Sequence, residues 1–298
     1  MRTSSEEGSA RFDPNPRRRM KIVLWGVLIV GVVALGFWGS RFRGEWRPKR
    51  LLEEADEKWH KADYLAAAHD YDRLVESYPT SALVPEAYYW KGVTSLLYLD
   101  DPKGAVDAFE KAIASDPPSP EVDFGLKARR YLAETYERYL NRPSVAIAVY
   151  EAIIEVTPDP GEAEEARYKI GGLYEAQGDF AQARVEWDIL VKKYPESAWA
   201  PAALYRKGGT YFVMGNCKKA LKTYTWVYTS YPESEVGPFA KYRAANCLEM
   251  GKQKEAAYAL YKELKDGAYP DQADIARKID QLKPGAPALD NESRPMEN

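Results

Sequence analysis

Two histidines are the only imidazoles available for metal or acid–base chemistry in this sequence of 298 residues. His60 and His69 are predicted on successive helices joined by a short turn, and Asp63 and Asp70 lie close to them in sequence. A two-histidine site completed by a carboxylate uses ligands that Zn²⁺ accepts. Histidines on the solvated faces of two helices would give the same pattern. We expect the solvated arrangement, and therefore no metal site.

The sequence carries no recognised catalytic motif. It has no P-loop, dinucleotide fingerprint, nucleophile elbow or zinc-protease motif. Without a base and nucleophile pair, we expect a protein that is not an enzyme, uses no cofactor and takes no small-molecule substrate. Residues 51–283 hold 38 Asp/Glu and 30 Lys/Arg with no basic stripe. Because nucleic-acid binding needs clustered Lys and Arg, this composition argues against it.

Two cysteines complete the reactive side chains. Cys217 begins one predicted helix and Cys247 lies late in the next, so antiparallel packing would bring those helix ends together. In an oxidising compartment the pair would be able to form a disulfide between the last two repeats. Two buried free thiols would fill small helix-facing positions equally well, and the sequence leaves both states open.

Prolines recur along the chain at intervals of 37 to 41 residues, and three other landmarks accompany them, which indicates a solenoid. The prolines are Pro79, Pro117, Pro158, Pro195, Pro232 and Pro270. The aromatic residues eight positions before the first five prolines are Tyr71, Phe109, Tyr150, Trp187 and Tyr224. The alanines four positions before those are Ala67, Ala105, Ala146, Ala183 and Ala220. The small residues that begin each pattern are Ala55, Gly92, Ala133, Gly171, Gly208 and, in the last unit, Ala244.

This spacing predicts two helices in each unit. A small residue lets a neighbouring helix approach closely, and an aromatic ring one turn after an alanine fills the space beside it. The proline ends the second helix, and turn residues such as Gln177–Asp179 separate the two. The sixth unit is atypical, with Ala256 followed by Leu260, and residues 271–282 are expected to form a capping helix. We predict an all-α solenoid of about six helix pairs, whose repeats end near residues 79, 117, 158, 195, 232 and 270.

The landmark pattern resembles the tetratricopeptide-repeat (TPR) family over about residues 50–283. Three segments resemble repeats of bacterial envelope TPR proteins of the BamD, CpoB and YfgM kind: YPTSALVPEAYYWKG, YPESAWAPAALYRKG and YPESEVGPFAKYRAANC. The resemblance implies a scaffold for protein–protein interaction in the cell envelope, with a role in secretion or outer-membrane assembly. Unlike the BamD-like relatives, the sequence has no cysteine near its start that could be lipidated.

An uncharged apolar run from Ile22 to Ser40 is long enough to cross a bilayer once. Trp25 and Trp38 lie towards its two ends, at the depth that indoles prefer. The basic residues before the run would also suit a cleaved signal, but the run is longer than a usual signal core and only Ala34–Gly36 approaches a cleavage site. We predict a basic disordered tail at 1–21, a transmembrane helix at 22–40, a basic juxtamembrane linker at 41–50, the solenoid at 51–283 and a disordered tail at 284–298.

The orientation of this span is not decided by charge, because five basic residues flank each side. A cytoplasmic N-terminus is favoured by the basic cluster that directly abuts the apolar run, and long C-terminal domains translocate largely regardless of their charge. We expect a single-pass inner-membrane protein whose body is periplasmic. A cytoplasm-facing adaptor, or an accessory subunit of an enzyme complex, remains the alternative.

TPR relatives bind partners through the concave surface lined by the first helix of each pair, so the resemblance points to that face. Three residues before each small landmark stand Leu52, Tyr89, Arg130, Tyr168, Tyr205 and Lys241. Four residues after it stand Trp59, Leu96, Glu137, Glu175, Phe212 and Leu248. The two sets are seven residues apart and share one helix face, with Gly172 and Gly209 leaving room between them.

These residues predict an aromatic, amphipathic groove for extended segments of partner or client proteins. Ordinary packing between helices is the alternative explanation for the same rings. The Lys and Asn set with which chaperone-binding TPR domains clamp a C-terminal carboxylate is absent from this face.

Overall fold

The computed structural model describes residues 46–115, 123–157, 159–265, 267 and 269–283. The expected transmembrane helix at 22–40, the first half of the linker at 41–50 and the two tails lie outside the described residues. Of the helices that are described, none is long and apolar enough to cross a bilayer.

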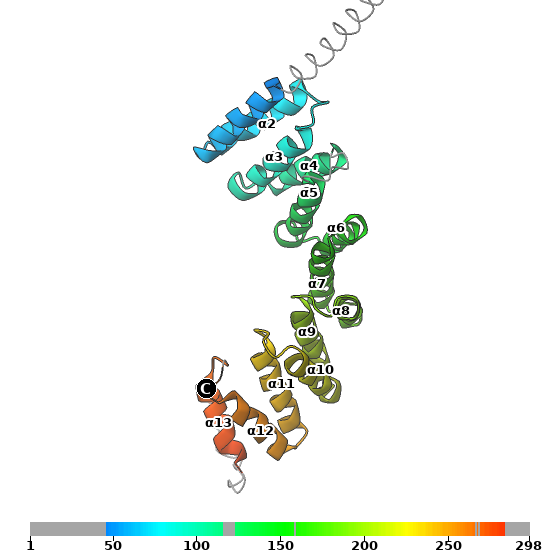
Figure 1. Ribbon diagram of the computed structural model, residues 1–298, viewed down its shortest axis with the longest axis vertical. Coiled ribbons are helices and arrows are strands. Elements are labelled where there is room, and N and C mark those ends of the chain that lie inside the picture. The colour runs from blue at the N-terminus through cyan, green and yellow to red at the C-terminus, as the bar shows by residue number, and fades with distance from the viewer. Residues whose placement is uncertain (1–45, 116–122, 158, 266, 268, 284–298) are drawn as a thin grey trace, which may run out of the picture.

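Every regular element in the described part of the chain is a helix, as predicted. A helix over residues 46–60 comes first. The elements after it are α2 (Tyr64–Ser77), α3 (Val84–Tyr98), α4 (Pro102–Ser115), α5 (Phe124–Glu134), η1 (Thr135–Tyr139), α6 (Pro143–Val156), α7 (Pro160–Ala176), α8 (Phe180–Lys193), α9 (Ala200–Val213), α10 (Cys217–Ser230), α11 (Gly237–Met250), α12 (Lys254–Leu264) and α13 (Gln272–Leu282). Each helix packs on the next along the chain, and the pairs stack into an elongated, curved solenoid (Figure 1).

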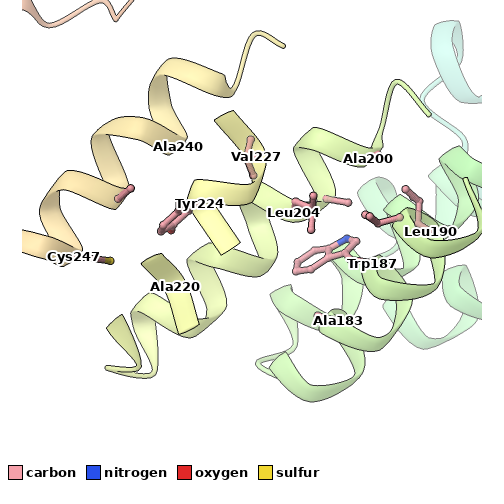
Figure 2. Packing of buried hydrophobic residues seen from close by; sticks show 13 residues of the cluster. Ala183, Trp187, Leu190, Ala200, Leu204, Ala220, Tyr224, Val227, Ala240 and Cys247 are labelled. Carbon is pink, nitrogen blue, oxygen red and sulfur yellow. The ribbon is translucent and has the colours of Figure 1, made fainter. Parts of the chain in front are cut away.

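The small landmarks lie directly beneath the aromatic ones. A Cβ atom placed on Gly171 would stand 2.3 Å from Nε1 of Trp187, and one on Gly208 would stand 2.6 Å from Cε1 of Tyr224. Both rings are almost completely buried, and Figure 2 shows them pointing between neighbouring helices. The predicted pairing of a small residue with a large ring therefore forms the core of each repeat.

The sixth unit keeps the register of its neighbours, which corrects the sequence analysis. Ala257 and Tyr261 are fully buried, whereas Ala256 is exposed and Leu260 is half-buried. Ala257 and Tyr261 stand 37 residues after Ala220 and Tyr224, so the repeat does not slip. By the same spacing, Ala245 rather than Ala244 is the equivalent of Gly208. Adjacent alanines disguised the register, and one position turns a helical side chain by about 100°.

The turn inside each pair repeats one backbone feature. A residue in the left-handed region occurs at Gly178 and Gly215, with φ of 79° and 73°. The equivalent positions in the other pairs hold Ala62, Asp100, Asn141 and Lys252, all with positive φ. Directly after most of these turns an Asp or Asn side chain accepts a hydrogen bond from the first turn of the next helix, as Asp179 does from the N–H of Gln182.

A candidate peptide-binding groove

The first helices of the pairs form a continuous surface, which we call the first-helix face. It consists of helix 46–60, α3, α5 with η1, α7, α9, α11 and α13, and α7 contacts α9 as α9 contacts α11. First and second helices alternate along the chain, and each second helix packs against two first helices. This packing places successive first helices side by side. Residues three and four apart on the same helix then point to the same side.

At the N-terminal end, the predicted groove residues lie largely inside the core. Tyr89 and Leu96 are 8% and 5% exposed, and Leu52 is also buried. The Tyr89 ring packs against Phe124 and Tyr131 at centroid distances of 5.5 and 5.8 Å. Its edge still borders a hollow of about 300 Å³ that Lys127, Arg130 and Glu134 also line. Packing between helices is thus the main role of these two side chains.

Trp59 lies half-buried in an aromatic cluster. Its ring meets Tyr98 edge-on at 5.5 Å and Trp90 at 6.1 Å, while Tyr64 and Tyr98 stack at 4.0 Å. The indole Nε1 is enclosed and has no hydrogen-bond partner among the described residues. Trp59 therefore ties the first two repeats together.

In the middle of the array, predicted charges connect successive first helices. Arg130 on α5 is exposed and forms ion pairs with Glu162 and Glu165 on α7, at 3.2 and 3.7 Å. Glu137 instead accepts a hydrogen bond of 3.0 Å from the hydroxyl of Tyr150 on α6. Burial of Tyr150, together with the nearby Glu137 carboxylate, raises the pKa of that hydroxyl above its usual value.

Tyr168 and Glu175 share one cation on the next first helix. Nε of Arg206 on α9 donates to Glu175 at 2.8 Å, and the same guanidinium stands 5.5 Å from the centre of the Tyr168 ring. Tyr168 also stacks on Trp199 at 4.7 Å. A Cβ on Gly172 would lie 2.7 Å from Nη1 of Arg206, so this glycine does leave room, and the guanidinium occupies it.

Tyr205 and Phe212 on α9 hold a second cation, Arg243 of α11. The guanidinium lies 5.8 Å from the centre of the Phe212 ring, and a hydrogen bond to Tyr205 raises the pKa of Arg243 above its usual value. Arg243 is exposed and no carboxylate of the described residues forms an ion pair with it. Unlike Arg130 and Arg206, it is a cation on this face that no acidic group neutralises.

Lys241 points away from the predicted groove. Its Nζ pairs with Glu263 of α12 at 2.9 Å and lies 5.3 Å from the Tyr228 ring of α10. Leu248 is buried. The unbroken 37-residue register of the last unit explains both positions, since Tyr242 rather than Lys241 is the equivalent of Tyr205, and Glu249 rather than Leu248 is the equivalent of Phe212.

Tyr242 is the residue that the sequence analysis missed, and a constant 37-residue step would have found it. Its hydroxyl donates to Asp274 of α13 at 2.7 Å, and its ring stacks on Tyr269 at 4.6 Å. Burial and the Asp274 carboxylate raise the pKa of Tyr242 to about 12.

Cys217 and Cys247 are free thiols in this structure and belong to one packed cluster. Burial, reinforced by the neighbouring Cys217, raises the pKa of Cys247 to about 12. A thiol with so high a pKa is a poor nucleophile at neutral pH. The predicted proximity of the two helix ends is thus observed, and formation of a disulfide stays a prediction.

The two histidines are exposed, at the end of helix 46–60 and on α2. Of the acidic residues near them, Asp63 caps α2, and Asp70 pairs with Lys58 and Arg73 and also lies 3.8 Å from Nδ1 of His69. Among the described residues no group of three His, Cys, Asp or Glu side chains is arranged to hold a metal ion.

Residues 52–120 and 165–197 each match a family model described as tetratricopeptide repeat. The chain therefore contains TPR repeats. No curated protein matches it by sequence.

Three solved structures illustrate its structural similarity. The C-terminal part of a TPR repeat-containing protein from Cytophaga hutchinsonii aligns with a TM-score of 0.56 and 17% identity, covering 78% of this chain and 84% of that one. PilW, a widely conserved type IV pilus biogenesis factor, aligns with a TM-score of 0.47 and 16% identity, covering 78% of this chain and 99% of that one. YrrB, a TPR protein with an unusual peptide-binding site, aligns with a TM-score of 0.45 and 21% identity, covering 64% of this chain and 90% of that one. The first of these likenesses shows the fold. Solenoids of this kind present extended concave surfaces that bind other proteins.

Proposed function

We propose that this TPR protein is a membrane-anchored, non-catalytic scaffold that binds extended segments of partner or client proteins in the bacterial cell envelope. The apolar run at 22–40 supports the anchor, and the repeat segments that resemble BamD, CpoB and YfgM support the envelope and a place in secretion or outer-membrane assembly. The body faces the periplasm in this proposal. Digestion of the body by protease added to spheroplasts is expected, whereas protection in intact spheroplasts would favour the cytoplasm-facing adaptor.

Arg243 is the observation that carries the binding role. It is exposed on α11, its guanidinium lies over the Phe212 ring and hydrogen-bonds to Tyr205, and no carboxylate of the described residues forms an ion pair with it. An extended polypeptide presents carbonyl oxygens and carboxylates that a guanidinium can bind in a bidentate manner. Tyr205 and Phe212 add apolar contact at low entropic cost. The surface thus suits a segment that carries an acidic or carbonyl-rich stretch beside an apolar residue.

Replacement of Arg243 by alanine tests this role. We expect Arg243→Ala to lower recovery of crosslinked partners from intact membranes at least about fivefold, because a charge-assisted contact is lost. Lys193→Ala is the matched control, since Lys193 of α8 also lies over a tyrosine ring, at 5.0 Å from Tyr194, but on a second helix. Equal recovery with both variants would exclude the first-helix face as the binding surface.

A further inference from the structure

Two adjoining hollows lie beside the loops that join one repeat to the next, away from the first-helix cations. They measure about 470 and 560 Å³ and flank the loops at 194–199 and 231–236. Tyr231 borders both hollows, and its hydroxyl donates to the carbonyl oxygen of Pro195 at 2.9 Å, which fixes the two loops together. We call this paired hollow the loop-edge groove.

A single difference between neighbouring repeats accounts for the first hollow. In the preceding repeat, the hydroxyl of Ser197 donates to Glu164 at 2.7 Å. Thirty-seven residues later the equivalents are Ser234 and Pro201, so proline stands where the glutamate was. The Ser234 hydroxyl is enclosed and has no hydrogen-bond partner among the described residues. The missing carboxylate therefore leaves both space and an unsatisfied hydroxyl at the wall of the hollow.

The rim of the groove is acidic. Glu196, Glu233 and Glu235 are exposed at its edges, and none forms an ion pair with a described basic side chain. Among the described residues that line the groove, Lys192 alone is basic. Three free carboxylates beside one lysine attract a positively charged ligand.

The walls between these charges are apolar. Trp226 of α10 is 45% exposed and borders the second hollow beside Pro195. Pro201, Ala202 and Val236 line the first. Exposed indole and proline surfaces in a groove suit the apolar side chains of an extended chain. A folded cationic surface has no such side chains to place in the groove.

We propose that the loop-edge groove docks an extended cationic segment of a partner protein, in which Lys or Arg residues are spaced by apolar residues. The basic side chains meet Glu196, Glu233 and Glu235, and the apolar ones enter the two hollows on either side of Tyr231. None of Arg130, Arg206 and Arg243 lines this groove, so one scaffold molecule can hold two segments of different charge. If the groove does not bind such a segment, the proposed role of Arg243 is unaffected.

Binding of a defined peptide to the purified full chain tests the proposal. The probe is a fluorescein-labelled nonapeptide made of three Arg-Pro-Leu triplets, and the same peptide with Glu in place of Arg is its counterpart. Fluorescence anisotropy should show binding of the basic peptide only. Removing two carboxylates with Glu233→Gln and Glu235→Gln should raise Kd about five- to tenfold.

Two further variants separate site-specific binding from general attraction. Pro201→Gln restores a polar side chain at the place of Glu164 and should weaken binding by filling the hollow, while glutamine remains compatible with the first turn of α9. The control Glu151→Gln with Glu155→Gln removes the same charge from an exposed stretch of α6.

The control pair should change Kd less than twofold. Equal weakening by the control, binding of the acidic peptide, absence of binding, or a groove variant that only alters self-association in sedimentation would each overturn the proposal.

Discussion

At the scale of single residues, substitutions of two adjacent glycines in α9 separate the effect of packing on stability from the effect of backbone entropy. A Cβ on Gly208 would overlap the buried Tyr224 ring at 2.6 Å, whereas one on Gly209 would meet only the Tyr224 hydroxyl, at 3.8 Å. We expect Gly208→Ala to destabilise the protein by about 1–3 kcal/mol, through forced displacement of the ring. Gly209→Ala should be neutral or stabilise it by up to about 1 kcal/mol, because alanine favours helix. Urea denaturation of the two variants measures both effects, and similar midpoints would contradict this packing.

The contact between Tyr242 and Asp274 predicts a pH dependence. Burial of Asp274 disfavours its charge, but hydrogen bonds from Tyr242 and Arg277 outweigh it and hold the pKa of Asp274 below its usual value. A depressed carboxyl pKa gives stability that is full above the unfolded pKa of about 4 and is lost as pH falls through the folded value. The stability difference between wild type and Asp274→Asn should therefore be largest above about pH 5 and shrink towards pH 3.

The control for this titration is Asp280→Asn, on the same helix. Asp280 is exposed and has no ion pair among the described residues, so its replacement should not reproduce the pH-dependent difference. A gap between wild type and Asp274→Asn that stays constant from pH 6 to pH 3 would contradict the assigned hydrogen bonds.

At the residue scale, a contact can be predicted from the sequence where a large ring requires a small residue beside it. Gly171 under Trp187 and Gly208 under Tyr224 could be predicted because only a small residue leaves room for a ring there. Lys241 could not be placed correctly, since Ala244 and Ala245 offer two equally small landmarks one position apart. Only packing decides between them, and it selects Tyr242 for the first-helix face.

At the scale of elements, the turn within each helix pair gives a paired test of backbone strain. Ala62 and Gly178 occupy the same left-handed position in different repeats, and nothing lies within 4 Å of a Cβ built on Gly178. Ala62→Gly should stabilise the protein by about 1 kcal/mol, and Gly178→Ala should destabilise it by a similar amount. Thermal unfolding measures both. Shifts of the same sign would contradict a shared turn conformation.

The helix pairs themselves were predictable because their breakers, caps and prolines are local signals. The π-helical turn η1 was not. It extends the first helix of the third unit at Thr135–Tyr139, where the hydroxyl of Thr135 donates to the carbonyl oxygen of Tyr131 at 2.6 Å. The proline interval that includes this unit is 41 residues, which indicated extra length but not where the helix would take it up.

At the scale of the whole molecule, function depends on side chains that the curved stack brings together from different repeats (Figure 1). Arg206 reaches back to Glu175, and Arg243 reaches back to Tyr205, each across one repeat. Such pairings depend on the angle between successive repeats, and this angle cannot be read from the spacing of residues in the sequence. The loop-edge groove was equally beyond sequence reasoning, because it arises from a glutamate that one repeat has and the next lacks.

Site-specific photo-crosslinking in intact membranes tests the central claim most directly. A benzoylphenylalanine in place of Phe239 leaves Arg243 intact, because Phe239 is 38% exposed on α11 four residues before it, on the same side of the helix. One in place of Val185, 47% exposed on the second helix α8, reports on the outer side. The account predicts a discrete crosslinked partner from position 239 and none from position 185. The same adducts from both positions, or adducts from position 185 alone, would contradict it.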